Sequence, residues 1–379
     1  MGKWETVRLS DIATLLNGRA YKQNELLKMG KYPVLRVGNF FSNRDWYYSD
    51  LELDSDKYCE NGDLLFAWSA SFGPKIWKGE KVIYHYHIWK ILTTERICKE
   101  FLYYYLDNVA ERVKAEGHGI AMIHTTKREM EERLIPLPPL ETQKQIAATL
   151  DKVTALIDMH KRQLELLEEL VKGRFVEMFG DPATNPKGWT TTPLLDMGYC
   201  KNGMNFHTGD SGIEMHCLGV GDFKDLSVID GTESLPVISL NEAPPEERML
   251  RDGDIVFVRS NGNKALVGRC LVVYPHNTPT TYSGFCIRYR LTSSEVNTTY
   301  LLRVLKADSM RKKMSGRGAN IQNLNQQILA TLDIPLPPIE QQQQFAAFVT
   351  QTDKSKSSIQ QSLAKLETLK KSLMQEYFG

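Results

Sequence analysis

The sequence predicts a mixed α/β (α+β) fold in which two globular domains are separated by two long helices that form an antiparallel coiled coil, with a pseudo-two-fold internal repeat. The first observation behind this prediction is a duplication, because residues 135–180 recur without a gap as residues 334–379. The second is a heptad spacing of apolar residues inside these two copies. The third is a β-rich pattern in the segment before each copy. The period is far too long for a solenoid, and two such units in one chain can imitate a two-fold homodimer.

The duplication extends into the segments that precede the two copies. Gly62–Phe66 resembles Gly253–Phe257, and Val37–Phe40 resembles Val220–Phe223. The alignment drifts between these matches, as it does where surface loops differ in length. We therefore expect a first domain at 1–140, a central helix at 141–180, a second domain at 181–338 and a C-terminal helix at 339–379.

Length and composition are those of a soluble globular protein with two cores. The chain has 379 residues, of which 42% are apolar and 25% are charged. No apolar run is long enough for a membrane helix and the first residues lack a signal-peptide pattern, so a cytoplasmic location without membrane contact is expected. Six scattered cysteines without a C-x-x-C pair indicate free thiols in a reducing compartment. Because the net charge is only +1, any nucleic-acid surface must be local, and the basic stretch 303–317 is one candidate.

Both copies carry the alternating four- and three-residue spacing of a coiled-coil seam. The seam positions are Ile146, Leu150, Val153, Ile157, Leu164 and Leu167 in the first copy, and Phe345, Val349, Ile359, Leu363 and Leu366 in the second. The second seam is polar in its middle, so neither helix is expected to be stable alone. His160 also falls on the seam, where a histidine is far more often accommodated in an interface than used as a ligand.

Prolines and glycines delimit these helices. The IPLPP lead-in at 135–139, repeated at 334–338, holds an extended path that cannot continue a strand or a helix. Each helix is therefore expected to leave its domain through a stiff strut. Segment 181–188 contains two prolines and a glycine, which should end the first helix and begin the second domain.

Each domain places a small polar loop directly after a predicted strand. The loops are 69–75 and 259–264, and both end in a lysine. Loops of this composition can bring backbone amides and hydroxyls to phosphates, while Arg, Asn and Lys side chains can read base edges. An ordinary hairpin loop explains the pattern equally well. The candidate DNA contacts in these loops are Ser69, Ser71, Lys75, Arg259, Ser260, Asn261, Asn263 and Lys264.

Two glycine pairs and one aromatic run give further candidates. Gly117 and His118 open a Gly-His-Gly turn, and Arg317 is the centre of a Gly-Arg-Gly turn at the matching position of the second repeat. Such turns can present backbone donors to phosphate or simply allow the chain to reverse. We favour DNA contact for Arg317 and leave His118 open. The alternation in Tyr84–Lys90 suggests a strand with one face buried, so most of its aromatic residues are expected in the core.

Motifs that a nucleic-acid enzyme would need are missing from the sequence. There is no Asn-Pro-Pro-aromatic motif, glycine-rich cofactor turn, Walker lysine loop, G-x-S-x-G or H-E-x-x-H. The carboxylates Asp252 and Asp254 sit at a turn before a strand, where their usual role is turn formation. The histidines and cysteines show no metal-ligand spacing. The sequence therefore predicts a binding protein with no catalytic residue and no metal site.

The duplicated I-P-L-P-P-[LI]-E-x-Q-x-Q segments precede long helices and follow domains that contain G-D-[LI]-[LV]-F and open at W-x4-L-x-D, at Trp4 and Trp189. Over essentially the whole chain, this arrangement resembles the specificity subunit of type I restriction–modification systems. The resemblance implies that each domain is a target-recognition domain for one half of a bipartite, asymmetric site in double-stranded DNA, and that the helices set the half-site spacing.

The resemblance also implies the partners and their cofactors. Two copies of a modification methyltransferase subunit and two copies of a restriction and translocase subunit would join this chain. No cofactor would bind the chain itself, because S-adenosylmethionine belongs to the methyltransferase, and ATP and Mg belong to the restriction partner. Helix residues off the seam would face the partner, and those expected to do so are Gln143, Gln145, Arg162, Glu165 and Glu169.

Three other functions stay open on the sequence alone. The chain could be the recognition subunit of a related system whose methyltransferase and nuclease are fused in one partner. It could be a scaffold without DNA, whose coiled coil clamps two identical proteins. A stand-alone nuclease is the third, and it predicts metal-dependent cleavage by the isolated chain. Neighbouring reading frames and the DNA preference of the purified complex would separate these readings.

Overall fold

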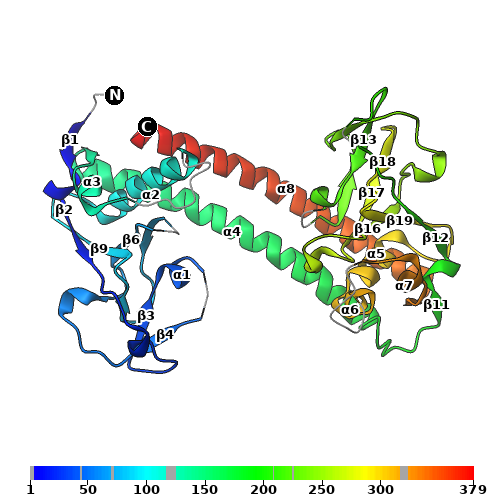
Figure 1. Ribbon diagram of the computed structural model, residues 1–379, viewed down its shortest axis with the longest axis horizontal. Helices are drawn as coiled ribbons and strands as arrows, with labels where there is room; N and C mark the ends of the chain where they lie inside the picture. The colour runs from blue at the N-terminus through cyan, green and yellow to red at the C-terminus, as the bar shows by residue number, and fades with distance from the viewer. Residues whose placement is uncertain are drawn as a thin grey trace. The chain divides into compact units, whose positions relative to one another are not determined.

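The computed structural model describes residues 4–42, 45–69, 72–116, 125–207, 209–223, 226–315 and 323–379. The chain divides into two compact units. Unit 1 comprises Met1–Arg162 and Gln360–Gly379, and unit 2 comprises Gln163–Ile359. Each unit therefore contains one globular domain together with parts of both long helices (Figure 1).

The domain of unit 1 contains two four-stranded sheets and a two-stranded ribbon. The strand orders are β2-β9-β6-β7, β4-β3-β8-β5 and β1-β10. The strands are β1 (Glu5–Arg8), β2 (Ala13–Asn17), β3 (Tyr32–Leu35), β4 (Tyr47–Ser49), β5 (Tyr58–Cys59), β6 (Leu64–Ala67), β7 (Gly73–Ile76), β8 (Val82–Tyr84), β9 (Ile88–Thr93) and β10 (Leu134–Leu137). The helices are α1 (Val37–Phe40), α2 (Lys99–Glu116) and α3 (Lys127–Glu131).

The domain of unit 2 repeats this plan, but with a five-stranded and a three-stranded sheet in place of the two four-stranded sheets. The strand orders are β12-β19-β16-β17-β14, β15-β13-β18 and β11-β20. The strands are β11 (Thr191–Pro193), β12 (Gly198–Asn202), β13 (Ile213–Leu218), β14 (Val228–Asp230), β15 (Val237–Leu240), β16 (Asp254–Val258), β17 (Cys270–Tyr274), β18 (Thr280–Tyr282), β19 (Cys286–Leu291) and β20 (Asp333–Pro335). The helices are α5 (Thr298–Lys306), α6 (Asp308–Ser315) and α7 (Gln326–Ala330).

The topological signature of the repeat is a strand that pairs in two directions. In unit 1, β3 is antiparallel to β4 and parallel to β8. In unit 2, β13 is antiparallel to β15 and parallel to β18. Both domains therefore have the same mixed connectivity, which identifies them as copies of one mixed α/β plan.

The two long helices are α4 (Leu140–Phe179) and α8 (Ile339–Phe378), with 40 residues each. The pairing of α4 with α8 is antiparallel within each unit. In unit 1, His160 Nε2 lies 3.1 Å from Ser362 Oγ, while Leu150 shares a core with Phe378. In unit 2, Glu168 pairs with Lys356 at 2.6 Å, and the rings of Phe175 and Phe345 lie 5.5 Å apart. Residue numbers thus rise along α4 as they fall along α8.

The predicted seam positions are all at least partly covered. In α4, four are buried and two half-buried; in α8, two are buried and three half-buried. The buried ones are Ile146, Leu150, Val153, Ile157, Phe345 and Val349, and the half-buried ones are Leu164, Leu167, Ile359, Leu363 and Leu366. His160 takes a place in this interface through its contact with Ser362.

Glycine ends the central helix. Gly180 follows α4 with a φ of +78°, and a Cβ there would lie 2.4 Å from Cγ of Pro186. The left-handed conformation after the last helical turn is the usual C-terminal stop and favours glycine. The sequence signal at 181–188 therefore acts together with Gly180, since the proline of that segment fills the space that a side chain would need.

The ends of the helices complete the cores of the domains. Met374 and Phe378 of α8 are buried among β-sheet and α2 residues of unit 1, and Figure 1 shows this red end of α8 beside α2. The carbonyl of Phe378 accepts hydrogen bonds from Asn108 Nδ2 at 3.3 Å and Arg112 Nη2 at 3.1 Å. In unit 2, Phe175 and Phe179 of α4 belong to the domain core in the same way. Each domain therefore depends on a helix segment that is distant in sequence.

A buried glutamine fastens each strut to its helix. Gln143 Oε1 accepts from Cys98 N at 2.7 Å, and its Nε2 donates to Arg96 O at 3.1 Å and Pro138 O at 2.8 Å. The expectation that Gln143 faces a partner is wrong, because its side chain is fully buried. Its position off the seam is covered by the strut and by the loop that leads into α2.

Gln342 makes the same three contacts in unit 2. Its Oε1 accepts from Asn297 N at 2.9 Å, and its Nε2 donates to Glu295 O at 3.1 Å and Pro337 O at 2.8 Å. The glutamine of the repeated I-P-L-P-P-x-E-x-Q motif therefore links the first turn of each long helix to the segments around it. We call Gln143 and Gln342 the glutamine bolts.

Three local expectations need correction. The start of each IPLPP lead-in does form a strand, because Leu134–Leu137 is β10 and Asp333–Pro335 is β20. Tyr84–Lys90 is not one strand: β8 ends at Tyr84 and β9 begins at Ile88, because the chain turns there from one sheet into the other. The expected loop 69–75 is also too long, since Gly73–Ile76 forms β7 and pairs with β6. Among the described residues, no helix combines the length and apolar character that a membrane crossing needs.

Candidate nucleic-acid interface

In unit 1 the end of β2 meets the turn between β8 and β9, at the junction of the two sheets, and we call this region the tip of unit 1. Gly18 N donates to Ile88 O at 3.2 Å, and Arg19 N donates to Tyr84 O at 3.0 Å. Tyr86 N returns a bond to Arg19 O at 3.1 Å. These backbone bonds hold the end of β2 against the turn between β8 and β9.

Unit 2 builds the same tip with different residues. Gly203 N donates to Cys286 O and Met204 N to Tyr282 O, both at 3.1 Å, and Gly284 N donates to Met204 O at 2.7 Å. These bonds join the end of β12 to the turn between β18 and β19, as in unit 1. The framework is made of main-chain atoms, so it does not depend on which side chains it carries.

Glycine is required where the two segments of the tip meet. A Cβ at Gly18 would lie 2.3 Å from Tyr84 O, and a Cβ at Gly203 would lie 2.1 Å from Ser283 O. Both distances are far below contact with backbone atoms. The Asn-Gly pair that recurs at the end of β2 and β12 is therefore the sequence signal for the tip, since only glycine allows this approach.

The residues that follow β6 in unit 1 and β16 in unit 2 are hydrogen-bonded to the tip of their unit. Trp68 N donates to His87 O at 3.1 Å in unit 1, and Arg259 N donates to Phe285 O at 2.8 Å in unit 2. The carbonyl of Trp68 also accepts from Thr125 N, and that of Arg259 from Leu324 N. The residues after β6 and β16 thus stand beside the β8–β9 and β18–β19 turns.

The unit 1 tip carries a cluster of aromatic and imidazole rings. The ring centroids of Trp68 and His87 lie 4.8 Å apart, and those of Tyr86 and His87 lie 3.9 Å apart. Trp68 Nε1 donates to Tyr86 O at 2.9 Å. Burial lowers the pKa of His85 to about 4, with smaller contributions from His87 and Arg36. His85 therefore carries a neutral ring at physiological pH and can both donate and accept hydrogen bonds.

A groove of about 460 Å³ opens beside these rings, and His85 and His87 are among the residues that line it. Arg36 also lines it, and its guanidinium carbon lies 5.2 Å from the centre of the Tyr47 ring. The groove thus combines stacking surfaces with a positive charge, which suits a nucleic-acid strand.

The unit 2 tip lines a groove of about 530 Å³ with a different chemistry. Arg259 Nη1 donates to Gly284 O at 3.2 Å, which aligns the guanidinium along the groove. Phe285 is 60% exposed, although large apolar side chains are seldom left in water. The polar groups Asn205 and Asn323 line the same groove.

The predicted loop residues of unit 2 lie in or next to this groove. Arg259 and Ser260 line it, and Ser260 forms an isolated bridge with Asn323. Asn261 Oδ1 accepts from Asn263 N at 2.8 Å, and Asn263 Oδ1 accepts from Ala265 N at 3.1 Å. Lys264 is exposed at the start of the short helix that Asn263 caps.

The predicted residues of unit 1 are more dispersed. Ser69 is 9% exposed beside the tip. Lys75 lies on β7, where its Nζ donates to Phe40 O at 2.6 Å and burial lowers its pKa. Its position fits a tie between β7 and α1. The remaining candidates, Ser71, Gly117, His118 and Arg317, lie outside the described residues.

The ring cluster of unit 1 and Phe285 of unit 2 were absent from the sequence-based candidates. The aromatic run had been assigned to a strand, so its exposed turn was hidden. The local signal that could have located both tips is the repeated Asn-Gly pair, taken together with the break of hydrophobic alternation after Tyr84.

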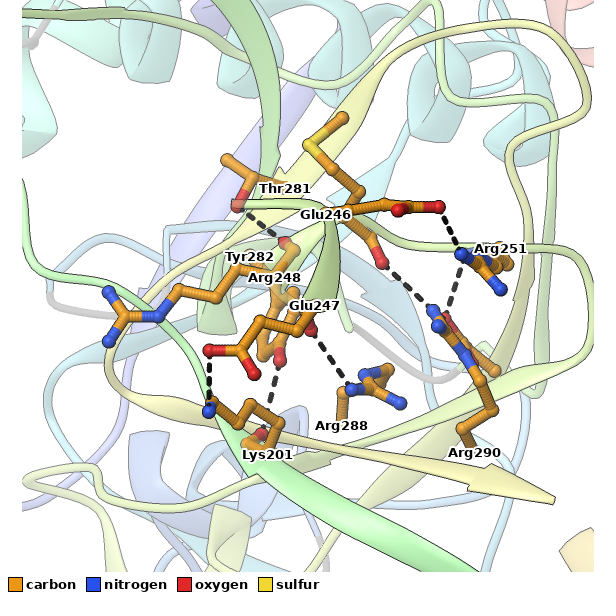
Figure 2. Close-up of polar contacts among 11 residues, drawn as sticks. Lys201, Glu246, Glu247, Arg248, Arg251, Thr281, Tyr282, Arg288 and Arg290 are labelled. Atoms are coloured by element: carbon orange, nitrogen blue, oxygen red, sulfur yellow. Dashed lines mark hydrogen bonds and ion pairs between the residues drawn. The ribbon is translucent and has the colours of Figure 1, made fainter. Parts of the chain in front are cut away.

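A partly buried set of ion pairs and hydrogen bonds lies below the tip of unit 2. Arg290 Nη2 lies 2.7 Å from Asp254 Oδ2, and these side chains are only 11% and 1% exposed. Arg288 Nη2 donates to Glu247 O at 3.0 Å, and Lys201 pairs with Glu247 at 2.6 Å (Figure 2). The network ties β12 and β19, which carry tip residues, to the segment that precedes β16.

Asp254 also performs the predicted turn function, since its Oδ2 accepts from Arg251 N at 2.7 Å. Unit 1 has a simpler counterpart, because Asp63 pairs with Lys90 at 2.7 Å. Within the described residues, no three His, Cys, Asp or Glu side chains are grouped as a metal site would require.

The two units therefore carry tips of different chemistry on one repeated main-chain framework. The family model described as the type I restriction modification DNA specificity domain matches residues 1–169 and 248–368. The chain therefore belongs to this family. The match confirms the resemblance seen in the sequence and assigns the chain a role in DNA specificity.

Individual relatives and solved structures agree with this assignment. The chain is 25% identical to the type I restriction enzyme MjaVIII specificity subunit of Methanocaldococcus jannaschii, covering 98% of this chain and 91% of the relative. It is 23% identical to the EcoBI specificity subunit of Escherichia coli, over 99% and 85% of the two chains. The crystal structure of the type I S subunit from M. genitalium has the same fold, with a TM-score of 0.61, 14% identity and coverage of 100% and 96%.

Proposed function

We propose that each domain of this chain reads one half of a bipartite, asymmetric DNA target. The observation that supports this most directly is the pair of tips. Their main-chain hydrogen bonds match one for one, whereas the side chains they present differ in charge, size and hydrogen-bonding capacity. Equivalent frameworks with unlike side chains fit two half-sites of different sequence.

The chemistry of each tip suits DNA in its own way. Arg259 supplies a guanidinium, which pairs with the edge of guanine in the major groove. Phe285 offers an apolar surface for a thymine methyl group or a base step. In unit 1, Trp68 and Tyr86 provide apolar contact, and His87 adds a ring nitrogen for hydrogen bonding. The exposed Lys264 and the Ser260 hydroxyl suit contacts to the phosphates.

We further propose that the long helices carry the partner proteins. Two methyltransferase copies would bring S-adenosylmethionine, and two restriction and translocase copies would use ATP and Mg. This chain would supply specificity while its partners supply the chemistry. Four exposed polar residues off the seam are the docking candidates, namely Gln145, Arg162, Glu165 and Glu169.

The rival functions are less well supported. A scaffold that clamps two identical proteins would have no need of two tips with unlike side chains. A recognition subunit for a fused methyltransferase–nuclease partner would use the same DNA-reading surfaces, but the matched relatives are named type I specificity subunits. The specificity subunit of a type I system is therefore the function favoured.

Mapping methylated adenines in cells that contain this chain and its methyltransferase tests the proposal. The wild-type chain should give one bipartite motif with two unlike halves. Arg259→Ala should relax or abolish reading of one half only, and His87→Ala should affect only the other half. The two variants are matched controls for each other. A motif that loses both halves in either variant would contradict the assignment of one half-site to each domain.

A further inference from the structure

A second feature of unit 2 is a cationic cavity next to the recognition loop. Its volume is about 180 Å³, which is room for several waters or for one tetrahedral oxyanion. Its lining includes Gly268–Cys270, directly after the loop that follows β16. Lys306, from the last turn of α5, and Arg311, from α6, also line it. Arg269 adds a third basic residue to the lining.

Lys306 lines the cavity in surroundings that disfavour its positive charge. Its Nζ donates to Ser227 Oγ at 2.5 Å. Burial is the largest effect and lowers the pKa of Lys306. Arg303 and Lys356 also lower this pKa, whereas Cys270 and Glu168 raise it. An anion in the cavity would raise the pKa of Lys306 again, since an opposite charge favours the protonated amine.

The guanidinium of Arg311 uses its Nη2 group as a donor, whereas its Nε has no acceptor among the described residues. Its Nη2 donates to Ala265 O at 2.9 Å and more weakly to Val267 O at 3.4 Å. Its Nε is buried and has no hydrogen-bond partner among the described residues. A buried guanidinium N–H without an acceptor is costly, so the charge of Arg311 is only partly compensated by the two carbonyls.

The nearby carboxylates are engaged elsewhere. Among the described residues, none of those that line the cavity is Asp or Glu. Glu168 pairs with Arg303 and Lys356, and Asp308 lies 3.4 Å from Lys172 Nζ. Among the described residues, these carboxylates therefore do not pair with Lys306 or Arg311.

Unit 1 lacks this site. At the repeat position of Lys306 it has Asp107, and at the position of Arg311 it has Arg112, which is bonded to the Phe378 carbonyl. The β-strand register places Pro74 where unit 2 has Cys270, because these residues face Phe66 and Phe257. The cavity is thus not part of the shared framework.

We propose that this cavity binds a phosphate-type oxyanion beside the side chains of Lys306 and Arg311, which line it. Guanidinium and ammonium groups together form strong charge-assisted hydrogen bonds to tetrahedral oxyanions. Because Arg311 also holds the Ala265 and Val267 carbonyls, an occupied site would stiffen the loop that carries Lys264. The proposal goes beyond half-site reading, since a phosphate group carries no base sequence. The oxyanion is either free phosphate or a phosphodiester of bound DNA.

Thermal unfolding of the full chain tests the free-phosphate source. Sodium phosphate should raise the melting temperature in a saturable way relative to sodium chloride at the same ionic strength. The rise should disappear in Lys306→Met and persist in Lys313→Met, which removes an exposed charge from the neighbouring helix α6. Lys306→Met should fold, because burial already disfavours the charge that it removes. An equal phosphate response in wild type and Lys306→Met would place any bound phosphate elsewhere and overturn the proposal.

The salt dependence of DNA binding, measured with the methyltransferase complex, tests the second source. If the cavity holds a DNA phosphate, Lys306→Met should reduce the slope of log K against log salt by about 0.9, the value for one phosphate contact. Lys313→Met sets the baseline for a surface charge. A chain with no phosphate-specific stabilisation and no Lys306-dependent change in slope would refute the site. Because this outcome leaves the methylation motif untouched, it is distinct from failure of the proposed function.

Discussion

The glutamine bolt gives the sharpest test of how each domain is held on its helix. Gln143→Leu keeps the side-chain volume but removes three hydrogen bonds, to Cys98 N, Arg96 O and Pro138 O. Each buried group left without a partner costs about 1–3 kcal/mol, so three at the lower end give a loss of about 3 kcal/mol. Leucine adds apolar burial but cannot satisfy any of these groups. The loss should be confined to unit 1.

Hydrogen exchange read by mass spectrometry can resolve this loss, because global unfolding of a two-unit chain is not described by one free energy. A loss of about 3 kcal/mol makes amide exchange roughly a hundredfold faster in the segments that open with the bolt. Exchange should therefore accelerate in the residues around Cys98 and the 135–139 strut, with unit 2 unchanged. Gln342→Leu should give the mirror result, with the change in unit 2 alone.

The matched control is Gln145→Leu, which makes the same substitution at an exposed position of the same helix turn. It should leave exchange within about twofold of wild type, as surface substitutions usually do. If Gln143→Leu costs less than about 1 kcal/mol, or if it loosens both units equally, the bolt is not what fixes domain to helix.

Two further predictions follow from unit 2. Burial opposes ionisation of Glu168, but the hydrogen bonds and charges of Arg303 and Lys356 outweigh it and lower its pKa to about 2. The stability that this pairing contributes is therefore present above the ordinary carboxyl pKa and is lost as the pH falls from there towards 2. Because the side chain of Glu168 is half exposed, this contribution is about 1–2 kcal/mol. Glu168→Gln should remove this acid-limb dependence from urea midpoints measured between pH 3 and 7, and an unchanged limb would contradict the pairing. Gly203→Ala should destabilise unit 2 by about 1–3 kcal/mol through backbone overlap, whereas Gly262→Ala, with open space around it, should be nearly neutral; equal melting temperatures would refute the close approach.

The long helices were predictable because their signals are local. The expected spans 141–180 and 339–379 differ from Leu140–Phe179 and Ile339–Phe378 by one residue at most at each end. Heptad spacing, a proline strut before the helix and a glycine after it all act within a few residues of the feature they determine. The family and the mixed α/β fold followed from the repetition of these signals, and the family match confirms them.

The bolt and the tips were not predictable because their partners are distant in sequence. Gln143 looked like a surface residue because it is off the seam, yet its acceptor at Arg96 and donor at Cys98 are 47 and 45 residues away. The turn at 85–87 kept the alternating pattern of a strand while the chain crossed between sheets. Neither feature is encoded in periodicity, since a period describes one face of one element and not the second surface that packs on it.

The construction of the tips explains how one framework can serve two unlike readers. The bonds that shape each tip run between main-chain atoms, and their only strict side-chain requirement is the absence of a Cβ at Gly18 and Gly203. Exposed positions on such a frame can change with little effect on stability. Trp68 and Arg259 therefore occupy equivalent positions of the two frameworks, one with an aromatic ring and the other with a positive charge. Gly18 and Gly203, in contrast, have no room for a side chain. Separating the residues that hold the shape from those that meet the ligand allows the two copies to diverge in what they read.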